Sequence, residues 1–527
     1  MTAAEFLHFR RLAGSCLYGL AVTLLVGLCY GAYWAGTYFS QDCFVWLCFA
    51  KFYETPQDLL FRNTLAGQFF RPVGEYWWLA VHAFAGDRVR AYQLAFLAVH
   101  FLNAGLASWL GLQIAGRGVG RVIFVLFALN PIFVAPVSNY YHYNFDTLGL
   151  AFYLSSLLLL SSACRRGNLW GGLLSLFTAV AAYFSKEAYF TLPAAAVLVI
   201  GVSQPGARWS AREVWRRRGW LAAHTVVCAV AWGWRWVIIG RFGGYGLAEI
   251  DSTTDWVGHI IERGSTLAGF AGWSMVPACE RWYGVEFFPL LCSVALLGLM
   301  TWRCWTACSG PSAVWCWSWI VVLWLPSMIM TTYAAVSFYP PLFGSVLLVA
   351  QVLRRWPFGS SIGLVIGTYY AIHGWAFFHD RAPYIDELRR QHAALRVLFP
   401  VESWASGENR RIILLDGEPD LFPDAVVKYA APPATSMSSI LIFNAAAPTN
   451  WVITNANDLL DIRPLVVSRT YQDGYMQMPP YRVYPLELDP NTVRLNQQLE
   501  ALTVLRWDGN GFREITAVQK PPGQPEK

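Results

Sequence analysis

The chain has 527 residues, of which 56% are apolar and only 14% are charged. A soluble domain carries about a quarter charged residues, so this composition excludes an ordinary soluble protein. Several apolar runs approach or exceed the ~20 residues that a helix needs to cross ~30 Å of hydrocarbon. The net charge of +6 comes from arginines that cluster in short loops. There it sets membrane orientation and does not predict nucleic-acid binding. The chain is therefore predicted to be a polytopic α-helical membrane protein.

The first apolar run, Leu12 to about Tyr38, follows a short segment that ends in Arg10 and Arg11. It is too long and too aromatic for a cleaved signal peptide, so we expect a retained helix with a cytoplasmic N-terminus. Ten further apolar runs are predicted to span, which gives about eleven transmembrane helices. They cover residues 91–114, 121–138, 146–163, 168–185, 189–204, 219–239, 287–302, 313–330, 341–353 and 360–378.

Arginines lie in alternate loops between these runs, which fixes the predicted orientation. The positive-inside rule places those loops in the cytoplasm and the C-terminus outside. This assignment requires that residues 256–276 do not cross, and we expect them to lie at the interface or to re-enter the membrane. The arginines concerned are Arg117, Arg121, Arg165, Arg166, the group from Arg208 to Arg218, Arg303, Arg354 and Arg355.

The character of the sequence changes after Asp380. Residues 1–380 are predicted to form the membrane domain, with a first outer loop at 38–90. Residues 381–399 read as a linking amphipathic helix, residues 400–518 as a small extracytoplasmic α/β domain, and residues 519–527 as a disordered tail. The predicted strands are Ile412–Leu415, Ile440–Phe443, Trp451–Thr454, Leu465–Ser468, Tyr481–Tyr484 and Leu502–Trp507, with a helix at Leu421–Tyr429 and a hairpin turn at Asp508-Gly-Asn-Gly511.

Two carboxylates are predicted at the outer membrane face. Asp42 follows the first span, and Asp146 begins the fourth. A carboxylate within or close to the bilayer costs free energy unless it is paired with a cation, hydrated by water or has a function. Together they could act as a general base and as a metal ligand or orienting group. The alternative is that each caps a helix N-terminus or pairs with an interfacial arginine.

Cations accompany these carboxylates on the predicted outer side. Arg71 lies among aromatic residues, where it could grip a phosphate or serve as an interfacial anchor. Glu75 either pairs with Arg71 or contacts substrate. Lys186 violates the orientation bias, which favours a phosphate or substrate role for Lys186 and its neighbour Glu187. The alternative is a local pair between the two.

Further polar and aromatic residues could line the same cavity or serve other roles. His142 is a candidate substrate contact, and Tyr333 and Tyr339 are predicted to face outward, as substrate contacts or as interfacial belt aromatics. His100 and Asn103, one turn apart, are expected to make a buried hydrogen-bonded pair between helices. Nucleotide-binding loops and the metalloprotease H-E-x-x-H motif are absent from the sequence.

These residues, taken in order, resemble the GT-C superfamily of polyprenyl-phosphate-sugar-dependent glycosyltransferases. The similarity is to the membrane half of the transmembrane O-mannosyltransferases with tetratricopeptide repeats and covers about residues 10–200. The sequence departs from the family at Gln41-Asp42, where a single carboxylate replaces a pair, and at Asn130, where a His is common. Tetratricopeptide repeats do not follow. The matching residues are Asp42, Arg71-Pro72, His100-Phe-Leu-Asn103, Leu126-Phe-Ala-Leu-Asn-Pro131, Asp146 and Ser185-Lys186-Glu187.

The resemblance implies a GT-C-like glycosyltransferase in a bacterial inner membrane. It would transfer a sugar from a polyprenyl-phosphate carrier to a glycan, lipid or protein acceptor on the outer face. Asp42 would be the base, and Asp146 would support it, through a divalent metal such as Mg²⁺ or Mn²⁺ if one binds. Arg71 and Lys186 would balance the leaving phosphate.

Two other classes of function remain open on the sequence. A transporter or flippase for a lipid-linked or polar solute would use the same charges as a pathway, although transporters place such residues near the midplane. A non-catalytic scaffold that binds envelope partners through its outer domain is the third class.

Overall fold

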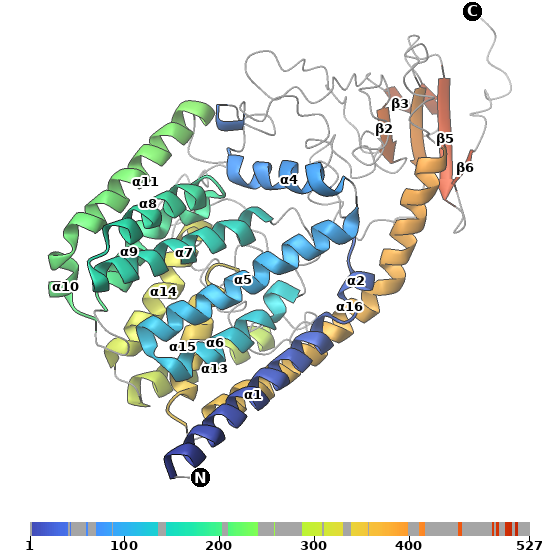
Figure 1. Ribbon diagram of the computed structural model, residues 1–527. Helices are drawn as coiled ribbons and strands as arrows, with labels where there is room; N and C mark the ends of the chain where they lie inside the picture. The colour runs from blue at the N-terminus through green and yellow to red at the C-terminus, as the bar shows by residue number, and fades with distance from the viewer. Residues whose placement is uncertain are drawn as a thin grey trace, which may run out of the picture. The chain divides into compact units, whose positions relative to one another are not determined.

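Figure 1 shows the computed structural model of the chain, which is mostly helical. The chain divides into two compact units. The first comprises Met1–Thr37, Leu59–Trp77 and Arg88–Ala382, and the second comprises Tyr38–Asp58, Trp78–Asp87 and Pro383–Lys527. The structure describes residues 3–39, 43, 59–61, 70–86, 88–134, 144–202, 209–240, 258, 287–307, 310–329, 339–356, 358–398, 411–416, 452–455, 487–489, 492–494, 501–507 and 512–514.

The helices lie mainly in the first unit. Their order along the chain is α1 (Ala3–Tyr30), α2 (Tyr33–Gly36), α4 (Pro72–Ala85), α5 (Val89–Ala115), α6 (Arg117–Ala128), α7 (Asn144–Arg166), α8 (Leu169–Tyr183), the 3₁₀ helix η4 (Glu187–Thr191), α9 (Leu192–Ile200), α10 (Ala211–Arg216), α11 (Arg218–Ile239), α13 (Phe287–Ala307), α14 (Gly310–Ile329), α15 (Leu342–Leu353) and α16 (Gly359–Leu398). Helix α4 from Trp78 onward and helix α16 from Pro383 onward belong to the second unit.

A helix lies at each predicted span, because long apolar runs make the position of a helix the most readable feature of this sequence. Among the described residues, four helical segments are long and apolar enough to cross a membrane: Cys16–Gly36, Val89–Ala115, Asn144–Arg166 and Arg218–Ile239. This finding is compatible with an α-helical membrane protein. The count of about eleven spans stays a prediction.

Two elements differ from expectation. Helix α4 lies inside the first outer loop, where no helix was predicted, and it begins at Pro72, a residue favoured at the first helical position. Helix α16 is a single helix of 40 residues that joins the predicted last span to the predicted linking helix. The rise in charge after Asp380 ends the apolar run without ending the helix, because the Arg, Glu, Leu and Ala residues that follow are good helix formers.

Helix α7 lies at the centre of the first unit. It packs against both α5 and α8. Within its most hydrophobic stretch of 18 residues, 72% of the residues are buried, compared with 17% in the corresponding stretch of α11. The sequence specifies a tight turn between α7 and α8. Gly167 has a φ of +67°, the left-handed conformation that ends many helices. Asn168 then caps α8 by accepting a hydrogen bond from the backbone N–H of Trp170 at 3.1 Å.

Helices α1 and α16 lie side by side in the first unit (Figure 1). Glycines on α16 allow this close approach, because a side chain at Gly374 would collide with the sulfur of Cys29. The Tyr30 ring also lies 6.1 Å from the ring of Phe378. The first helix of the chain is thus packed against the last long one.

Short strands lie in the C-terminal part of the second unit. One sheet has the order β2-β1-β5-β6, in which β1 pairs in parallel with β2 and β5, while β5 and β6 form the antiparallel hairpin expected on either side of Asp508-Gly-Asn-Gly511. A second pair, β3 and β4, was not predicted. The strands are β1 (Arg411–Asp416), β2 (Val452–Asn455), β3 (Glu487–Asp489), β4 (Thr492–Arg494), β5 (Ala501–Trp507) and β6 (Phe512–Glu514).

Several predictions fall outside the described residues. The interfacial segment 256–276 does so except for Gly258, as do the predicted helix Leu421–Tyr429 and the remaining predicted strands. The α/β domain as a whole therefore stays a prediction.

Candidate functional site

Five ionisable side chains gather in the first unit, at the start of α4, the start of α7, the loop into η4 and the C-terminal half of α11. Two arginines and a glutamate form one group, and a lysine and an aspartate form another beside it. None of the five side chains is more than 12% exposed. We call them the charge cluster: Arg71, Asp146, Lys186, Glu187 and Arg235.

Glu187 forms ion pairs with two guanidinium groups. Arg71 binds it through both arms of its fork, with Nε donating to Oε2 at 3.0 Å and Nη2 donating to Oε1. The Nη2 of Arg235 lies 3.5 Å from Oε2 of the same carboxylate. Burial by itself raises the pKa of the Glu187 carboxyl, but the positive charges of Arg71 and Arg235 outweigh burial and hold that pKa well below its ordinary value. Glu187 is therefore ionised.

Asp146 pairs with Lys186. The Lys186 ammonium donates to Oδ1 of Asp146 at 2.6 Å, and the two side chains are only 12% and 4% exposed. Arg71 is close enough to Asp146 to act on it electrostatically. The charges of one group therefore affect the ionisable side chains of the other. Arg71 also lies over the ring of Phe145, 5.7 Å from its centre.

The local sequence places these side chains. Pro72 starts α4 directly after Arg71, and the backbone N–H of Val73 donates to the carbonyl of Phe184 at 3.2 Å, which brings Arg71 to the loop that carries Lys186 and Glu187. A side chain at Gly74 would collide with the ring of Phe145. The start of α4 can therefore lie directly against the start of α7 only because residue 74 is glycine.

The start of α7 is held by hydrogen bonds to its backbone. The hydroxyl of Tyr189 donates to the carbonyl of Asp146, and the amide of Asn103 donates to the carbonyl of Thr147 at 2.7 Å. Tyr189 reaches this point because Gly149 leaves room for its ring. Asp146 is thus fixed through its neighbouring backbone as well as through its carboxylate.

Tyr339 is buried, which corrects the expectation that it faces outward. It is 0% exposed, and its hydroxyl accepts from the Asn103 amide at 3.0 Å. His100 Nε2 lies 3.0 Å from the carbonyl of Ala128, which only accepts, so Nε2 carries the proton in the neutral ring. Nδ1 is then an acceptor, and the Tyr339 hydroxyl donates to it at 2.9 Å. His100 and Asn103 therefore meet through Tyr339 and not through each other.

Replacing Tyr339 with Phe tests this junction. Tyr339→Phe removes the donor to His100 and the acceptor for Asn103 and leaves both groups buried, so we expect the free energy of unfolding to fall by about 1–3 kcal/mol. Thermal unfolding of the purified protein in detergent measures this loss. Tyr369→Phe, at a tyrosine on α16 that is 40% exposed, is the matched control. Equal melting temperatures for both variants would contradict the assigned network.

Only some of the predicted site residues lie within the described part of the chain. Asp42, His142 and Tyr333 lie outside it. Glu75 is fully buried in the first turn of α4. Arg71, Asp146, Lys186 and Glu187 come together, and their chemical roles stay predictions.

The pairing inside the cluster differs from expectation. Arg71 binds the carboxylate of Glu187, a partner that was not predicted. The alternative of a local pair between Lys186 and Glu187 is wrong, because each binds a residue from a different part of the chain. Lys186 has extended backbone, with φ at −161°, while Glu187 begins η4, so these sequence neighbours point to different partners.

Arg235 was missed by the sequence analysis. It lies near the C-terminus of α11 and is 2% exposed, and its Nη1 donates to the carbonyl of Phe70 at 2.8 Å. Its Nε and Nη2 make no hydrogen bond with any described residue. The available signal was its position, because an arginine inside a predicted span on the side away from the cytoplasm is costly unless it is used.

The described residues alone do not supply a metal site. They contain no group of three His, Cys, Asp or Glu side chains arranged to hold an ion. Oδ1 of Asp146 is bound by Lys186, and the oxygens of Glu187 are bound by guanidinium groups.

The charge cluster can bind an anion. Its three cations face two carboxylates among these five residues, and the buried carboxylate of Glu75 lies one helical turn from Arg71. A guanidinium with unused N–H groups in a buried site is a donor for phosphate or carboxylate oxygens. Comparison with known proteins adds no assignment: no protein-family model matches the chain, and no curated protein sequence matches it significantly.

Proposed function

We propose that the chain is an integral membrane glycosyltransferase of GT-C type. It takes a sugar from a polyprenyl-phosphate carrier and transfers it to an envelope acceptor at the outer face of a bacterial inner membrane. In this proposal the chain crosses the membrane eleven times, the N-terminus is cytoplasmic, and the C-terminal strands belong to a small α/β domain on the outer side.

The observation that carries the proposal is a buried cluster of cations in which one guanidinium keeps donors without a hydrogen-bond partner in the described part of the chain. Arg235 supports it most directly, since two of its N–H groups have no hydrogen-bond partner among the described residues. Buried polar groups are nearly always hydrogen-bonded, so a missing partner indicates a ligand or ordered water. A phosphate attached to a lipid tail fits, because the tail can stay in hydrocarbon while the phosphate reaches the end of the helices.

The charges then act on the leaving group. An acceptor hydroxyl attacks the anomeric carbon of the sugar, its proton passes to a carboxylate base, and the bond from that carbon to the phosphate oxygen breaks. The lipid phosphate leaves with one more negative charge than it had in the donor. Cations held in place beforehand stabilise that charge as it develops and need no rearrangement at the moment of reaction. Arg71, Lys186 and Arg235 take this role, and Glu187 holds the two guanidiniums in position.

The direct test is a transfer assay with the purified chain in lipid nanodiscs. A polyprenyl-phosphate sugar labelled in the sugar is supplied together with envelope extracts as acceptor, and released lipid phosphate is measured. Glycosyl transfer releases lipid phosphate in step with labelled product. A transporter or flippase moves the donor across a vesicle membrane without releasing lipid phosphate, and that result would overturn the proposal.

Arg235→Gln is expected to slow donor turnover while the protein stays folded. Losing one donor to the developing charge costs about 10²–10³ in kcat for comparable sites. Glu187 keeps its two-armed contact with Arg71 in the variant. Arg218→Gln is the matched control, because Arg218 lies on the same helix at its other end. Turnover of Arg235→Gln equal to that of the control would remove Arg235 from the donor site.

A further inference from the structure

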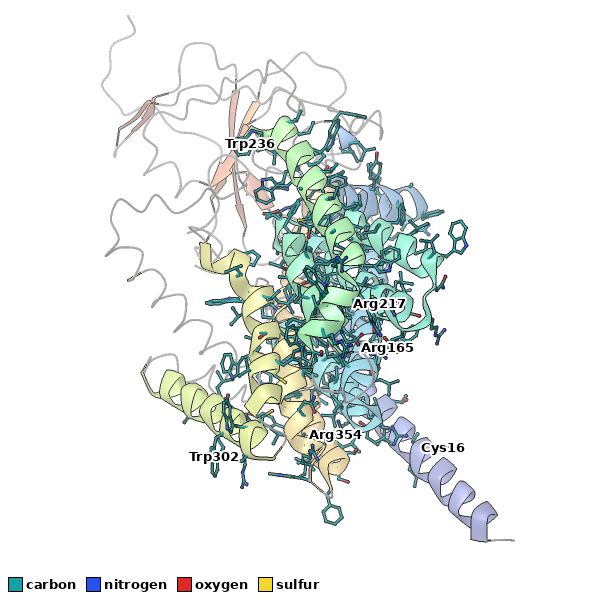
Figure 2. The ribbon with its side chains drawn as sticks, turned by 90° about the vertical axis from the view of Figure 1, so that its left-hand side faces the viewer. Cys16, Arg165, Arg217, Trp236, Trp302 and Arg354 are labelled. Atoms are coloured by element: carbon teal, nitrogen blue, oxygen red, sulfur yellow. The ribbon has the colours of Figure 1, made fainter. Side chains whose placement is uncertain are left out.

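A second group of arginines lies at the other end of α11 from the charge cluster. It comprises the last residues of α7 and the residues of α10 and the start of α11. Figure 2 shows Arg165 and Arg217 next to each other, at the end of α11 opposite Trp236. Arg165, Arg216 and Arg217 are all close enough to Cys164 to act on it electrostatically, so these segments meet in the fold. We call the group the arginine patch: Arg165, Arg166, Arg212, Arg216, Arg217 and Arg218.

Few acidic groups balance this patch. Arg216 pairs with Glu213 at 2.5 Å, and Arg165 donates to the carbonyl of Gln113 at 2.8 Å. Arg166, Arg212 and Arg217 make no ion pair with any residue that the structure describes. Six positive charges thus face a single carboxylate within these segments. Because Arg166 and Arg212 are exposed, they are accessible to a partner.

Large apolar side chains surround the arginines. Trp170 is 73% exposed, Leu169 is 61% exposed and Trp215 is 69% exposed. The guanidinium of Arg218 lies 4.8 Å from the centre of the Trp215 ring. Tryptophan and arginine side by side at the end of an apolar helix are typical of the level at which lipid headgroups lie.

We infer that the arginine patch binds the headgroups of anionic phospholipids. Charge complementarity selects this partner, because unpaired guanidiniums match phosphate oxygens in a two-armed geometry and exposed tryptophans match the adjoining acyl chains. The patch lies at the end of the helices that the positive-inside rule assigns to the cytoplasm. The inference rests on the helices crossing a membrane and is independent of the glycosyl transfer proposed above.

The competing explanation is that these arginines only set orientation. Orientation depends on the number of positive charges in a loop, whereas lipid binding depends on where unpaired guanidiniums meet. The triple variant Arg166→Gln, Arg212→Gln, Arg217→Gln leaves Arg165, Arg216 and Arg218 to keep the loops inside. Its matched control removes three charges from other cytoplasmic loops: Arg121→Gln, Arg303→Gln and Arg355→Gln.

The experiment measures cardiolipin binding by the full chain in phosphatidylcholine nanodiscs, by titration with a fluorescent cardiolipin. A basic residue near a membrane contributes roughly fivefold to binding of anionic lipid, so the triple variant should bind on the order of 100-fold more weakly than wild type. The control triple should bind as wild type does. Equal binding by both triples would overturn the inference.

Two further arms keep the test decisive if the variant does not fold. Wild type should be stabilised against heat by cardiolipin and not by phosphatidylcholine alone. Soluble glycerol phosphate at the same concentration should give no stabilisation, which separates a membrane lipid from a free phosphate ligand. A wild-type chain with no preference for cardiolipin, or one stabilised equally by glycerol phosphate, would also overturn the inference.

Discussion

Asp42→Asn is expected to lower donor turnover by about 10²–10⁴-fold, the range that a lost general base costs. The resemblance to GT-C enzymes implies that Asp42 is the base, and this role is part of the proposal. Asp146 is paired with Lys186, and Glu187 is paired with two arginines. Asparagine keeps the size of the side chain and cannot accept the proton.

Asp146→Asn is the companion variant. It removes the charge that neutralises Lys186 and keeps the amide oxygen as an acceptor, so we expect a smaller loss of turnover than in Asp42→Asn. Both variants should be compared at equal amounts of folded protein, judged by thermal unfolding. Normal turnover by Asp42→Asn would end the assignment. A larger loss in Asp146→Asn than in Asp42→Asn would transfer the role of base to Asp146.

The positions of the helices could be predicted because hydrophobic length is a local property. Each apolar run in the first 380 residues coincides with a helix. The end of α16 could not be predicted, because a helix can continue after the hydrophobic residues that reveal it have ended. Charged residues end the apolar run at Asp380, but α16 continues to Leu398. The same distinction explains why α4 was missed within a loop that is too polar to cross a bilayer.

The membership of the charge cluster was more predictable than its pairing. Ionisable groups at the ends of apolar runs cost free energy unless they are paired or have a function. This cost identified Arg71, Asp146, Lys186 and Glu187. Their partners depend on side-chain direction and on which helices touch, and neither is written in the spacing of the residues. Tyr339 shows the same limit: its neighbours Pro340 and Pro341 indicate a turn, but only the packing of the fold places its hydroxyl between His100 and Asn103.

The strongest structural consequence concerns Glu187. Glu187→Gln leaves the guanidiniums of Arg71 and Arg235 buried with no carboxylate between them. Removing one partner of a buried ion pair costs about 3–5 kcal/mol, because the remaining charge stays desolvated. We therefore expect a large fall in the melting temperature in nanodiscs and a lower yield of folded protein. The loss should exceed that of Arg235→Gln, which leaves the contact between Glu187 and Arg71 in place.

Glu213→Gln is the matched control for this variant, because it breaks another ion pair between glutamate and arginine in the same unit. In that pair the Arg216 side chain is 60% exposed and the Glu213 side chain 21%, and pairs open to solvent contribute about 0–1 kcal/mol. The pH dependence gives a second check. The pKa of Glu187 is held below its ordinary value, so the stability it contributes is present above the ordinary glutamate pKa of about 4.3 and is lost as pH falls. The difference in stability between wild type and Glu187→Gln should therefore be constant near neutral pH and shrink in acid. Equal melting temperatures for Glu187→Gln and Glu213→Gln at neutral pH would show that Glu187 does not hold the two arginines in place, and the geometry proposed for the donor phosphate would lose its support.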